Sequence, residues 1–216
     1  MKKLRNQDGG TLAPVRNIKR SKFGKQTTFF PSRKNGSQIV CEVRLEADAC
    51  FYWEHDKNVV SYREQPECLL IEVEGKPRRY TPDFEVRYAN GLRKFVEVKP
   101  ENVYRKPKYL ALYRAAREFL LARGDDFELF TDDQIRQQPR LDNLIKTYSQ
   151  ARGAVPLERA YLRDQLSQLK PPMRISDLLT LPSPPSPASL SAAIFELELR
   201  CDWTKPISIN SQVSWG

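Results

Sequence analysis

Apolar residues recur at two different spacings along the chain, and each spacing predicts a different kind of element. From residue 37 to about residue 55 they fall three and four positions apart, which predicts an amphipathic helix. The apolar stripe of this helix consists of Val40, Val43, Ala47, Cys50 and Phe51. Glu46 interrupts the stripe one turn from Val43 and Cys50, so we expect its carboxylate to point toward the core.

Alternation of apolar and polar residues predicts a β region between residues 59 and 99. Strands are expected at residues 59–62, 68–73, 79–88 and 92–99. Asn90-Gly91 is a strong signal for a hairpin that joins the last two strands. Pro100 ends the last strand, because proline cannot donate a hydrogen bond to a neighbouring strand.

The elements that follow predict a crossover back to the sheet. Pro107 stands near the start of a helix with apolar positions between residues 110 and 120, and Gly124 is placed to end it. Residues 127–130 then form a short apolar strand. Since a helix separates it from strand 92–99, we expect it to lie parallel to that strand or to its neighbour. Residues 37–138 are therefore predicted to form an α/β domain, a mixed β-sheet core flanked by helices.

The last third of the chain has a different pattern. Helices are expected at residues 141–151, 156–169, 175–181 and 189–200, with a break rich in proline and serine at 182–187. Two short alternating runs, 207–209 and 212–215, then flank Asn210-Ser211 and predict a hairpin. Helices followed by a hairpin are the order of a winged helix, so residues 139–216 are predicted to form a winged-helix-like α+β domain.

The net charge of +9 is concentrated at the N-terminus. Residues 1–34 hold ten lysines and arginines against one acid, and the other 182 residues balance at 26 basic and 26 acidic. A basic arm on a neutral body is typical of a tail that binds a polyanion, although a solvated leader has the same composition. We expect the arm, residues 1–36, to contact DNA through Lys19, Arg20, Lys22 and Lys25.

Several classes of protein are disfavoured by composition. No apolar run approaches the roughly 20 residues that cross a membrane, and the basic N-terminus lacks the apolar stretch of a secretory signal. The four cysteines form no C-x-x-C pair and the chain has one histidine, so a zinc site is not expected. We therefore expect a cytoplasmic, DNA-associated protein with reduced thiols, whose chemistry depends on carboxylates, lysines or a hard metal ion.

Acidic and basic residues with catalytic potential lie on the predicted hairpin. Asp83 follows Pro82 on one strand, and alternation places Glu97 and Lys99 on one face of the next strand. Two carboxylates on neighbouring strands can hold one or two Mg²⁺ ions, for which Mn²⁺ can substitute, and a nearby lysine can stabilise the charge of a reacting phosphate. The simpler alternative is an exposed cross-strand ion pair on a surface hairpin.

The context of these residues favours the catalytic interpretation. The strand that carries Glu97 is apolar on its other face and leads into the crossover, which predicts a central position in the sheet. Glu46 supplies a further acid, for which Glu42 and Glu54 are alternatives one and two turns away. Arg78 and Arg79 flank Asp83 with positive charge, as contacts to DNA phosphates require.

The order of these residues resembles the PD-(D/E)xK nuclease superfamily and, more closely, the TnsA family. Four segments carry the resemblance: L-E-A-D at 45–48, V-S-Y-R-E-Q-P at 60–66, R-Y-T-P-D-F at 79–84 and V-E-V-K-P at 96–100. The resemblance implies a restriction-endonuclease-like core. It also implies that Glu46, Asp83, Glu97 and Lys99 are catalytic, with Glu46, Asp83 and Glu97 as metal ligands. Some family members have glutamine where Glu97 stands.

The TnsA family is the endonuclease subunit of heteromeric cut-and-paste transposases, including those coupled to CRISPR effectors. The resemblance therefore implies Mg²⁺-dependent cutting of the 5′ strands of double-stranded DNA at transposon ends. It implies two partners, a DDE transposase that cuts and joins the 3′ strands and an AAA+ ATPase regulator contacted by the C-terminal region. Two alternatives remain, a stand-alone restriction-type or junction-resolving nuclease and a DNA-binding adaptor whose carboxylates are structural.

Overall fold

The structure is a computed structural model that describes residues 27–216. Lys19, Arg20, Lys22 and Lys25 lie outside the described residues, so their expected DNA contacts remain predictions. The described chain divides into two compact units: unit 1 consists of residues 27–47 and 58–132, and unit 2 of residues 48–57 and 133–216. In the part of the chain that the structure describes, no helix is long and apolar enough to cross a bilayer.

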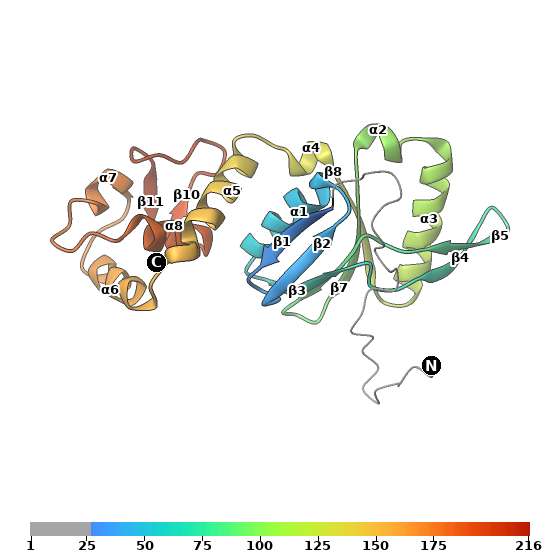
Figure 1. The fold of residues 1–216 in the computed structure, drawn as a ribbon, viewed down its shortest axis with the longest axis horizontal. Helices are drawn as coiled ribbons and strands as arrows, with labels where there is room; N and C mark the ends of the chain where they lie inside the picture. The colour runs from blue at the N-terminus through green and yellow to red at the C-terminus, as the bar shows by residue number, and fades with distance from the viewer. Residues whose placement is uncertain (1–26) are drawn as a thin grey trace, which may run out of the picture. The chain divides into compact units, whose positions relative to one another are not determined.

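A four-stranded mixed sheet is the centre of unit 1 (Figure 1). Its order is β3-β6-β7-β8, with β6 and β7 antiparallel and β7 and β8 parallel. The predicted mixed sheet and the parallel crossover are therefore confirmed, and β7 is an internal strand as expected. The strands are β3 (Val59–Glu64), β6 (Phe84–Tyr88), β7 (Arg93–Lys99) and β8 (Asp126–Thr131).

Helix α3 (Pro107–Ala122) covers one face of this sheet (Figure 1). Its buried residues Tyr113, Ala116 and Leu120 pack against Phe95 of β7 and Phe127 of β8. Burial of each large apolar side chain contributes about 1.5–3 kcal/mol, so this layer anchors the helix to the strands. The short helix α2 (Glu101–Tyr104) links β7 to α3.

The segment that enters the first helix differs from prediction. β1 (Thr28–Ser32) and β2 (Ser37–Cys41) form an antiparallel hairpin, and helix α1 (Arg44–His55) begins only after it. The expected helical start at residue 37 is therefore wrong. The hairpin pairs Phe30 with Ile39 and buries both, and this burial of alternate residues outweighs the spacing of three and four seen in the sequence.

The expected strand at residues 79–88 is two strands in two sheets. β5 (Lys76–Tyr80) pairs with β4 (Leu69–Val73), whereas β6 starts at Phe84 and pairs with β3 and β7. The break falls at Thr81-Pro82-Asp83, where proline cannot donate to a ladder and the chain changes sheet. Asp83 therefore lies in the connection just before β6 rather than within a strand.

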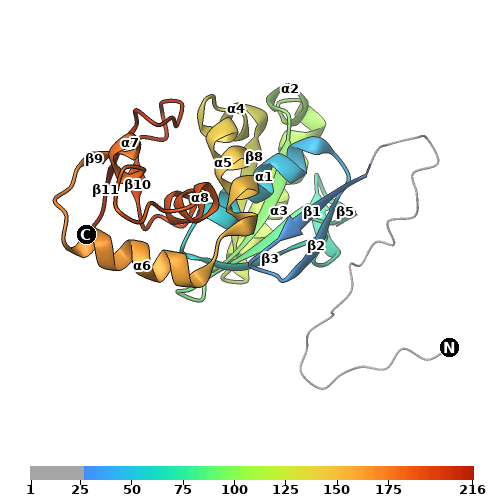
Figure 2. The same cartoon turned by 60° about the vertical axis from the view of Figure 1, so that its left-hand side comes forward.

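Unit 2 contains helices around a small antiparallel sheet of order β10-β11-β9. Helix α8 packs against α5, η1 and α6 (Figure 2). Residues 207–209 are not a strand, so the expected C-terminal hairpin around Asn210-Ser211 is wrong. The elements that lie wholly in unit 2 are α5 (Arg140–Gln150), η1 (Ala151–Gly153), α6 (Pro156–Ser167), β9 (Met173–Arg174), α7 (Ile175–Leu178), α8 (Pro187–Phe195), β10 (Arg200–Cys201) and β11 (Gln212–Ser214). Helix α4 (Asp132–Ile135) begins at the last residue of unit 1.

The sheet of unit 2 forms because apolar residues that are distant in the sequence are buried together in the core of this unit. Val213 of β11 pairs with Met173 and with Cys201, and it lies in the core of unit 2 with Leu166 and Leu199. The four cysteines, all within the described residues, are not joined in disulfides. The histidine, His55, packs its ring against Phe195 and Trp203 within unit 2.

Candidate active site

Asp83, Glu97 and Lys99 converge in unit 1. The Lys99 Nζ lies 2.8 Å from Asp83 Oδ2 and 3.0 Å from Glu97 Oε1. These two distances limit the separation of the carboxylate oxygens to about 5.8 Å. The same ammonium lies 3.2 Å from the carbonyl oxygen of Val98, so three oxygens surround one positive charge.

The connection before β6 holds Asp83 in place. Its Oδ2 accepts a hydrogen bond of 2.8 Å from the backbone N–H of Val98, beyond the end of the β6–β7 ladder at Phe84 and Val96. Burial raises the pKa of Asp83 above its ordinary value, and the positive charge of Lys99 opposes part of that shift. Asp83 is therefore fixed in position by a backbone contact, and the nearby Lys99 ammonium favours its ionised form.

Two tyrosine hydroxyl groups orient Glu97. Tyr80, the last residue of β5, donates to Glu97 Oε2 at 2.7 Å, and Tyr113 of α3 donates to Oε1 at 3.1 Å. Glu97 is only 4% exposed. Burial, followed by the negative charge of Asp83, raises the pKa of Glu97 to about 7. A cation close to Glu97 would therefore favour its ionised form.

Lys99 carries a charge that does not depend on pH in the working range. Burial alone would lower its pKa, but the negative charges of Asp83 and Glu97 outweigh burial and raise the pKa above its ordinary value. The ammonium is therefore a fixed positive charge at the end of β7.

Glu46 lies in the first turn of α1 and is buried, as the sequence predicts. Its Oε2 accepts a hydrogen bond of 2.6 Å from the backbone N–H of Glu42, which fixes the carboxylate at the helix N-terminus. Burial, followed by the charge of Asp83, raises the pKa of Glu46 to about 7. The influence of Asp83 on this pKa places the two acids in one electrostatic site.

The alternatives to Glu46 differ in position. Glu42 is partly exposed, and its negative charge contributes to the raised pKa values of both Asp83 and Glu46. Glu54 belongs to unit 2. Glu42 is therefore a peripheral member of the same acidic site.

Comparison with known families agrees with this geometry. Residues 56–132 match the family model described as TnsA-like endonuclease N terminal. This segment of the chain is therefore similar to a TnsA-like endonuclease domain. The matched segment includes Asp83, Glu97 and Lys99, and it ends before unit 2 continues at residue 133. No curated protein matches the chain.

The donor set of this site suits a hard divalent cation. Carboxylate and carbonyl oxygens from Asp83, Glu97, Glu46 and Val98 are ligands of the type that Mg²⁺ prefers, and two of the acids have pKa values raised to about 7. Within residues 27–216, no group of three or more acidic, histidine or cysteine side chains converges as a complete metal-ligand set. A Mg²⁺ ion here would be held by carboxylates of this set, with backbone oxygen and water as the remaining ligands, as is usual for this ion in proteins.

Three polar residues of the TnsA-like domain were missed as site residues in the sequence. Tyr113 fits the apolar stripe of α3, and its hydroxyl group also contacts Glu97. Tyr80 and Gln65 lie within the segments that carry the family resemblance, but nothing in their spacing indicates their contacts. Gln65 donates its backbone N–H to the carbonyl oxygen of Asp83 at 2.8 Å.

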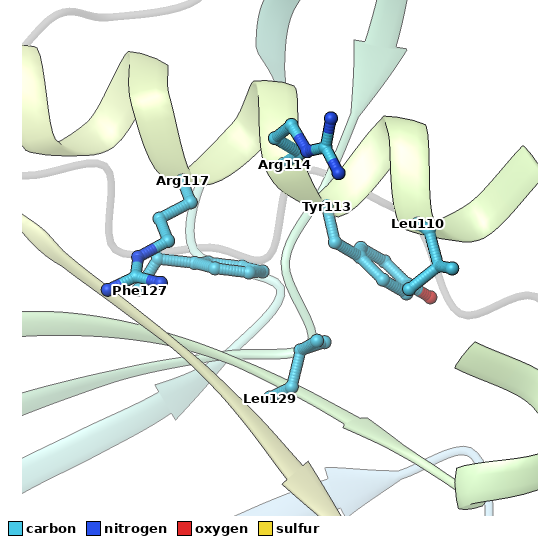
Figure 3. A pocket seen from close by; sticks show the side chains of 6 residues that line it. All are labelled: Leu110, Tyr113, Arg114, Arg117, Phe127 and Leu129. Atoms are coloured by element: carbon cyan, nitrogen blue, oxygen red, sulfur yellow. The ribbon is translucent and has the colours of Figure 1, made fainter. Parts of the chain in front are cut away.

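A pocket of about 370 Å³ lies beside the TnsA-like site, between α3 and β8 (Figure 3). The ring of Tyr113 lines it, while the hydroxyl group of the same residue reaches Glu97. Tyr113 therefore separates the pocket from the carboxylates. The lining residues are Leu110, Tyr113, Arg114 and Arg117 from α3 and Phe127 and Leu129 from β8.

Proposed function

We propose that this chain is a Mg²⁺-dependent DNA endonuclease that cuts the 5′ strands at transposon ends, in concert with a DDE transposase and an AAA+ ATPase regulator. The observation that carries the proposal is the convergence of Asp83 and Glu97 on the Lys99 ammonium inside a TnsA-like endonuclease domain. In an exposed ion pair on a surface hairpin both acids would lie in solvent, whereas here Glu97 is buried and Asp83 is partly buried.

Asp83, Glu97 and Glu46 are the residues that would hold one or two Mg²⁺ ions, with Mn²⁺ as a substitute. A bound divalent ion polarises the phosphodiester, acidifies water and stabilises the leaving oxygen. The raised pKa values of Glu46 and Glu97 support this role. Burial destabilises the ionised form of both acids, and a nearby cation would stabilise that form.

The other residues of the site have complementary roles. Lys99 places a permanent positive charge where the negative charge of the reacting phosphate grows. Tyr80 and Tyr113 hold the Glu97 carboxylate in one orientation through their hydroxyl groups. This fixed geometry reduces the reorganisation that the reaction would otherwise require.

Positive charge near the site fits a DNA substrate. Arg78 and Arg79 are exposed on β5, the strand that ends at Tyr80. Exposed arginine side chains can bind the phosphates of a DNA backbone. The same strand carries Tyr80, whose hydroxyl group donates to Glu97. We assign Arg78 and Arg79 to the DNA-contacting surface on this basis.

Unit 2 has a place in the same proposal. Its helices and three-stranded antiparallel sheet are compatible with a winged-helix-like domain in which the β9–β11 pair extends the sheet. We assign contact with the AAA+ regulator to this unit, as the family resemblance implies.

The decisive experiment separates 5′ from 3′ cleavage. In Asp83→Ala the partner transposase still cuts and joins the 3′ strands, so the element stays attached to its donor through the uncut 5′ strands. Replication then converts the product into a cointegrate instead of a simple insertion. Long-read sequencing of insertion products from the complete transposition machinery measures this ratio, with Lys99→Ala as a second variant that loses charge stabilisation but keeps the metal ligands.

A matched control is Asp126→Asn, which removes the charge of a half-exposed acid on β8 that pairs with Lys94. This control should give simple insertions as the wild type does. Simple insertions at wild-type frequency from Asp83→Ala would refute the proposed role. Loss of all products would instead assign Asp83 to folding or assembly.

A further inference from the structure

Gln65 has an unusual combination of burial and conformation. It follows β3 directly, is 8% exposed and has a φ of 42°, in the left-handed region that side chains other than glycine rarely adopt. The next residue is Pro66, which disfavours helical conformations in the residue before it. Such conformations persist where surrounding contacts require them, and they concentrate at functional sites.

The contacts of Gln65 are with two acids of the candidate site. Its backbone N–H donates to the carbonyl oxygen of Asp83 at 2.8 Å. Its side-chain Nε2 donates to Glu42 Oε1, also at 2.8 Å. The left-handed backbone thus lets one residue bind the Asp83 main chain and the Glu42 carboxylate together.

The remaining atom of the amide, Oε1, is buried and has no hydrogen-bond partner. Its identity follows from chemistry: a carboxylate only accepts, so the amide must turn its nitrogen toward Glu42 and its oxygen away. Buried acceptors are nearly always satisfied by protein or by ordered water. The Gln65 oxygen therefore calls for a donor that the protein does not supply.

In the structure the charged groups of the site do not supply that donor. The side chains of Glu42, Glu46 and Asp83 are acceptors when they are ionised. The Lys99 ammonium, the cation of this site, is directed at Asp83, Glu97 and the Val98 carbonyl. Water, especially water that a divalent cation polarises, is the donor that suits a neutral amide oxygen beside carboxylates.

We propose that Gln65 is a positioning residue for the hydrated divalent cation of this site. Its Oε1 accepts a hydrogen bond from water on the cation, and its Nε2 holds Glu42 beside the same water. Gln65 thereby joins the Asp83 connection, the entry to α1 and the hydration shell of the metal. This inference rests on the proposed function, because it requires a divalent cation at Asp83 and Glu97.

The test measures metal binding without DNA or catalysis. Gln65→Met keeps the length of the side chain and the strain of the backbone but removes both polar atoms. Calorimetric titration of the full-length protein with MnCl₂ should show an affinity lowered by about tenfold or more, as for other residues that orient the surroundings of a metal. The melting temperature of the metal-free protein should change little, because one hydrogen bond and one unpaired acceptor disappear together.

A second substitution separates the two polar atoms. Gln65→Glu keeps an oxygen that can accept from water but loses the donor to Glu42. It should restore most of the Mn²⁺ affinity that Gln65→Met loses, while lowering the melting temperature of the metal-free protein because two carboxylates then face each other. Gln38→Met, at an exposed position on β2, is the matched control and should bind Mn²⁺ as the wild type does.

Each outcome decides a different point. Equal Mn²⁺ affinity in wild type and Gln65→Met would overturn the role of Gln65 while leaving the proposed function intact. A lower melting temperature of metal-free Gln65→Met with unchanged affinity would make Gln65 a structural residue only. Absence of Mn²⁺ binding by the wild type, with Asp83→Asn behaving identically, would overturn the metal site and this inference together.

Discussion

The Glu97 carboxylate is surrounded by groups that stabilise its charge, although its burial opposes that charge. Tyr80, Tyr113 and Lys99 all direct hydrogens at its two oxygens. Burial, followed by the negative charge of Glu97, holds the pKa of the Tyr80 hydroxyl well above its ordinary value, so this group remains a donor throughout the working pH range. The two neutral tyrosine hydroxyl groups therefore orient the Glu97 carboxylate, and the Lys99 ammonium stabilises its negative charge.

Replacing Tyr80 with phenylalanine tests that arrangement. Tyr80→Phe leaves Glu97 Oε2 without its hydroxyl donor, and an unsatisfied buried acceptor costs about 1–3 kcal/mol. We expect the free energy of unfolding to fall by that amount and the rate of DNA cleavage to fall at least tenfold. Urea denaturation and cleavage assays with the complete machinery measure both.

Tyr109→Phe is the matched control for Tyr80→Phe. Tyr109 also lies in unit 1, where its ring stacks on that of Tyr113, and it is only partly buried. Its substitution should leave cleavage unchanged. An unaltered cleavage rate in Tyr80→Phe would show that the hydroxyl group does not orient Glu97 for the proposed reaction.

Pairing between β3 and β6 depends on a buried charge as well as on apolar residues. Glu85 of β6 is fully buried and accepts from Arg63 of β3 and from Arg87. Burial alone would raise the pKa of Glu85, but the hydrogen bonds and charges of the two arginines outweigh it and lower the pKa below its ordinary value. The ionised form of Glu85 is therefore more stable in the folded protein than in the unfolded chain.

This shift predicts a specific dependence of stability on pH. A carboxyl group with a lowered pKa stabilises the fold above its ordinary pKa, near 4.5, and that contribution is lost as the pH falls through the lower folded value. In Glu85→Gln the unfolding free energy should be reduced at pH 7, and the difference from wild type should shrink below about pH 4.5. Urea titrations in EDTA at several pH values measure the difference.

Glu46 and Glu97 contribute the opposite dependence of stability on pH. Because both acids are present in wild type and in Glu85→Gln, their contribution cancels in the difference between the two proteins. Glu46 and Glu97 have raised pKa values, so their contributions are complete at low pH and are lost as the pH rises toward 7. Glu128→Gln, at a partly exposed acid that pairs with Lys94 on β7, is the control and should show a much smaller difference. A constant difference between wild type and Glu85→Gln at all pH values would refute the assignment.

Charge is distributed over the whole molecule so that the N-terminal segment carries the excess. Residues 1–34 hold the entire net charge of +9, and the remainder is balanced. Arg78 and Arg79 add local positive charge close to the carboxylates of unit 1. DNA binding should therefore combine a strong contribution from the arm, which is independent of DNA sequence, with weaker contacts near the site.

Neutralising the arm tests that division. Replacement of Lys19, Arg20, Lys22 and Lys25 by alanine should weaken DNA binding and reduce the slope of log affinity against log salt by about 0.9 for each phosphate that the protein no longer binds. Fluorescence anisotropy over a series of salt concentrations measures the slope. A control with four lysines or arginines replaced in unit 2 should change it less, and an unchanged slope in the arm variant would show that the arm takes no part.

Local sequence determined the elements whose residues interact with near neighbours. The pattern in residues 92–99 predicted an internal strand with Glu97 and Lys99 on one face, and Pro107 and Gly124 predicted the limits of the following helix. The segments around Asp83 and Glu97 also carried the family resemblance that the match over residues 56–132 confirms. These features depend on periodicity and backbone preference, which are readable in a single sequence.

Tertiary structure decided the features that depend on residues distant in the chain. The β1–β2 hairpin replaced an expected helix because pairing Phe30 with Ile39 buries both side chains. The expected strand at 79–88 divided between two sheets, so that Tyr80 contacts Glu97 from the end of β5 and Asp83 contacts Lys99 from the connection before β6. Contacts of Gln65 with Glu42, and of Tyr113 with Glu97, join segments 16 to 23 positions apart. Such contacts have no local periodicity, because the folded chain alone brings their atoms within hydrogen-bonding distance.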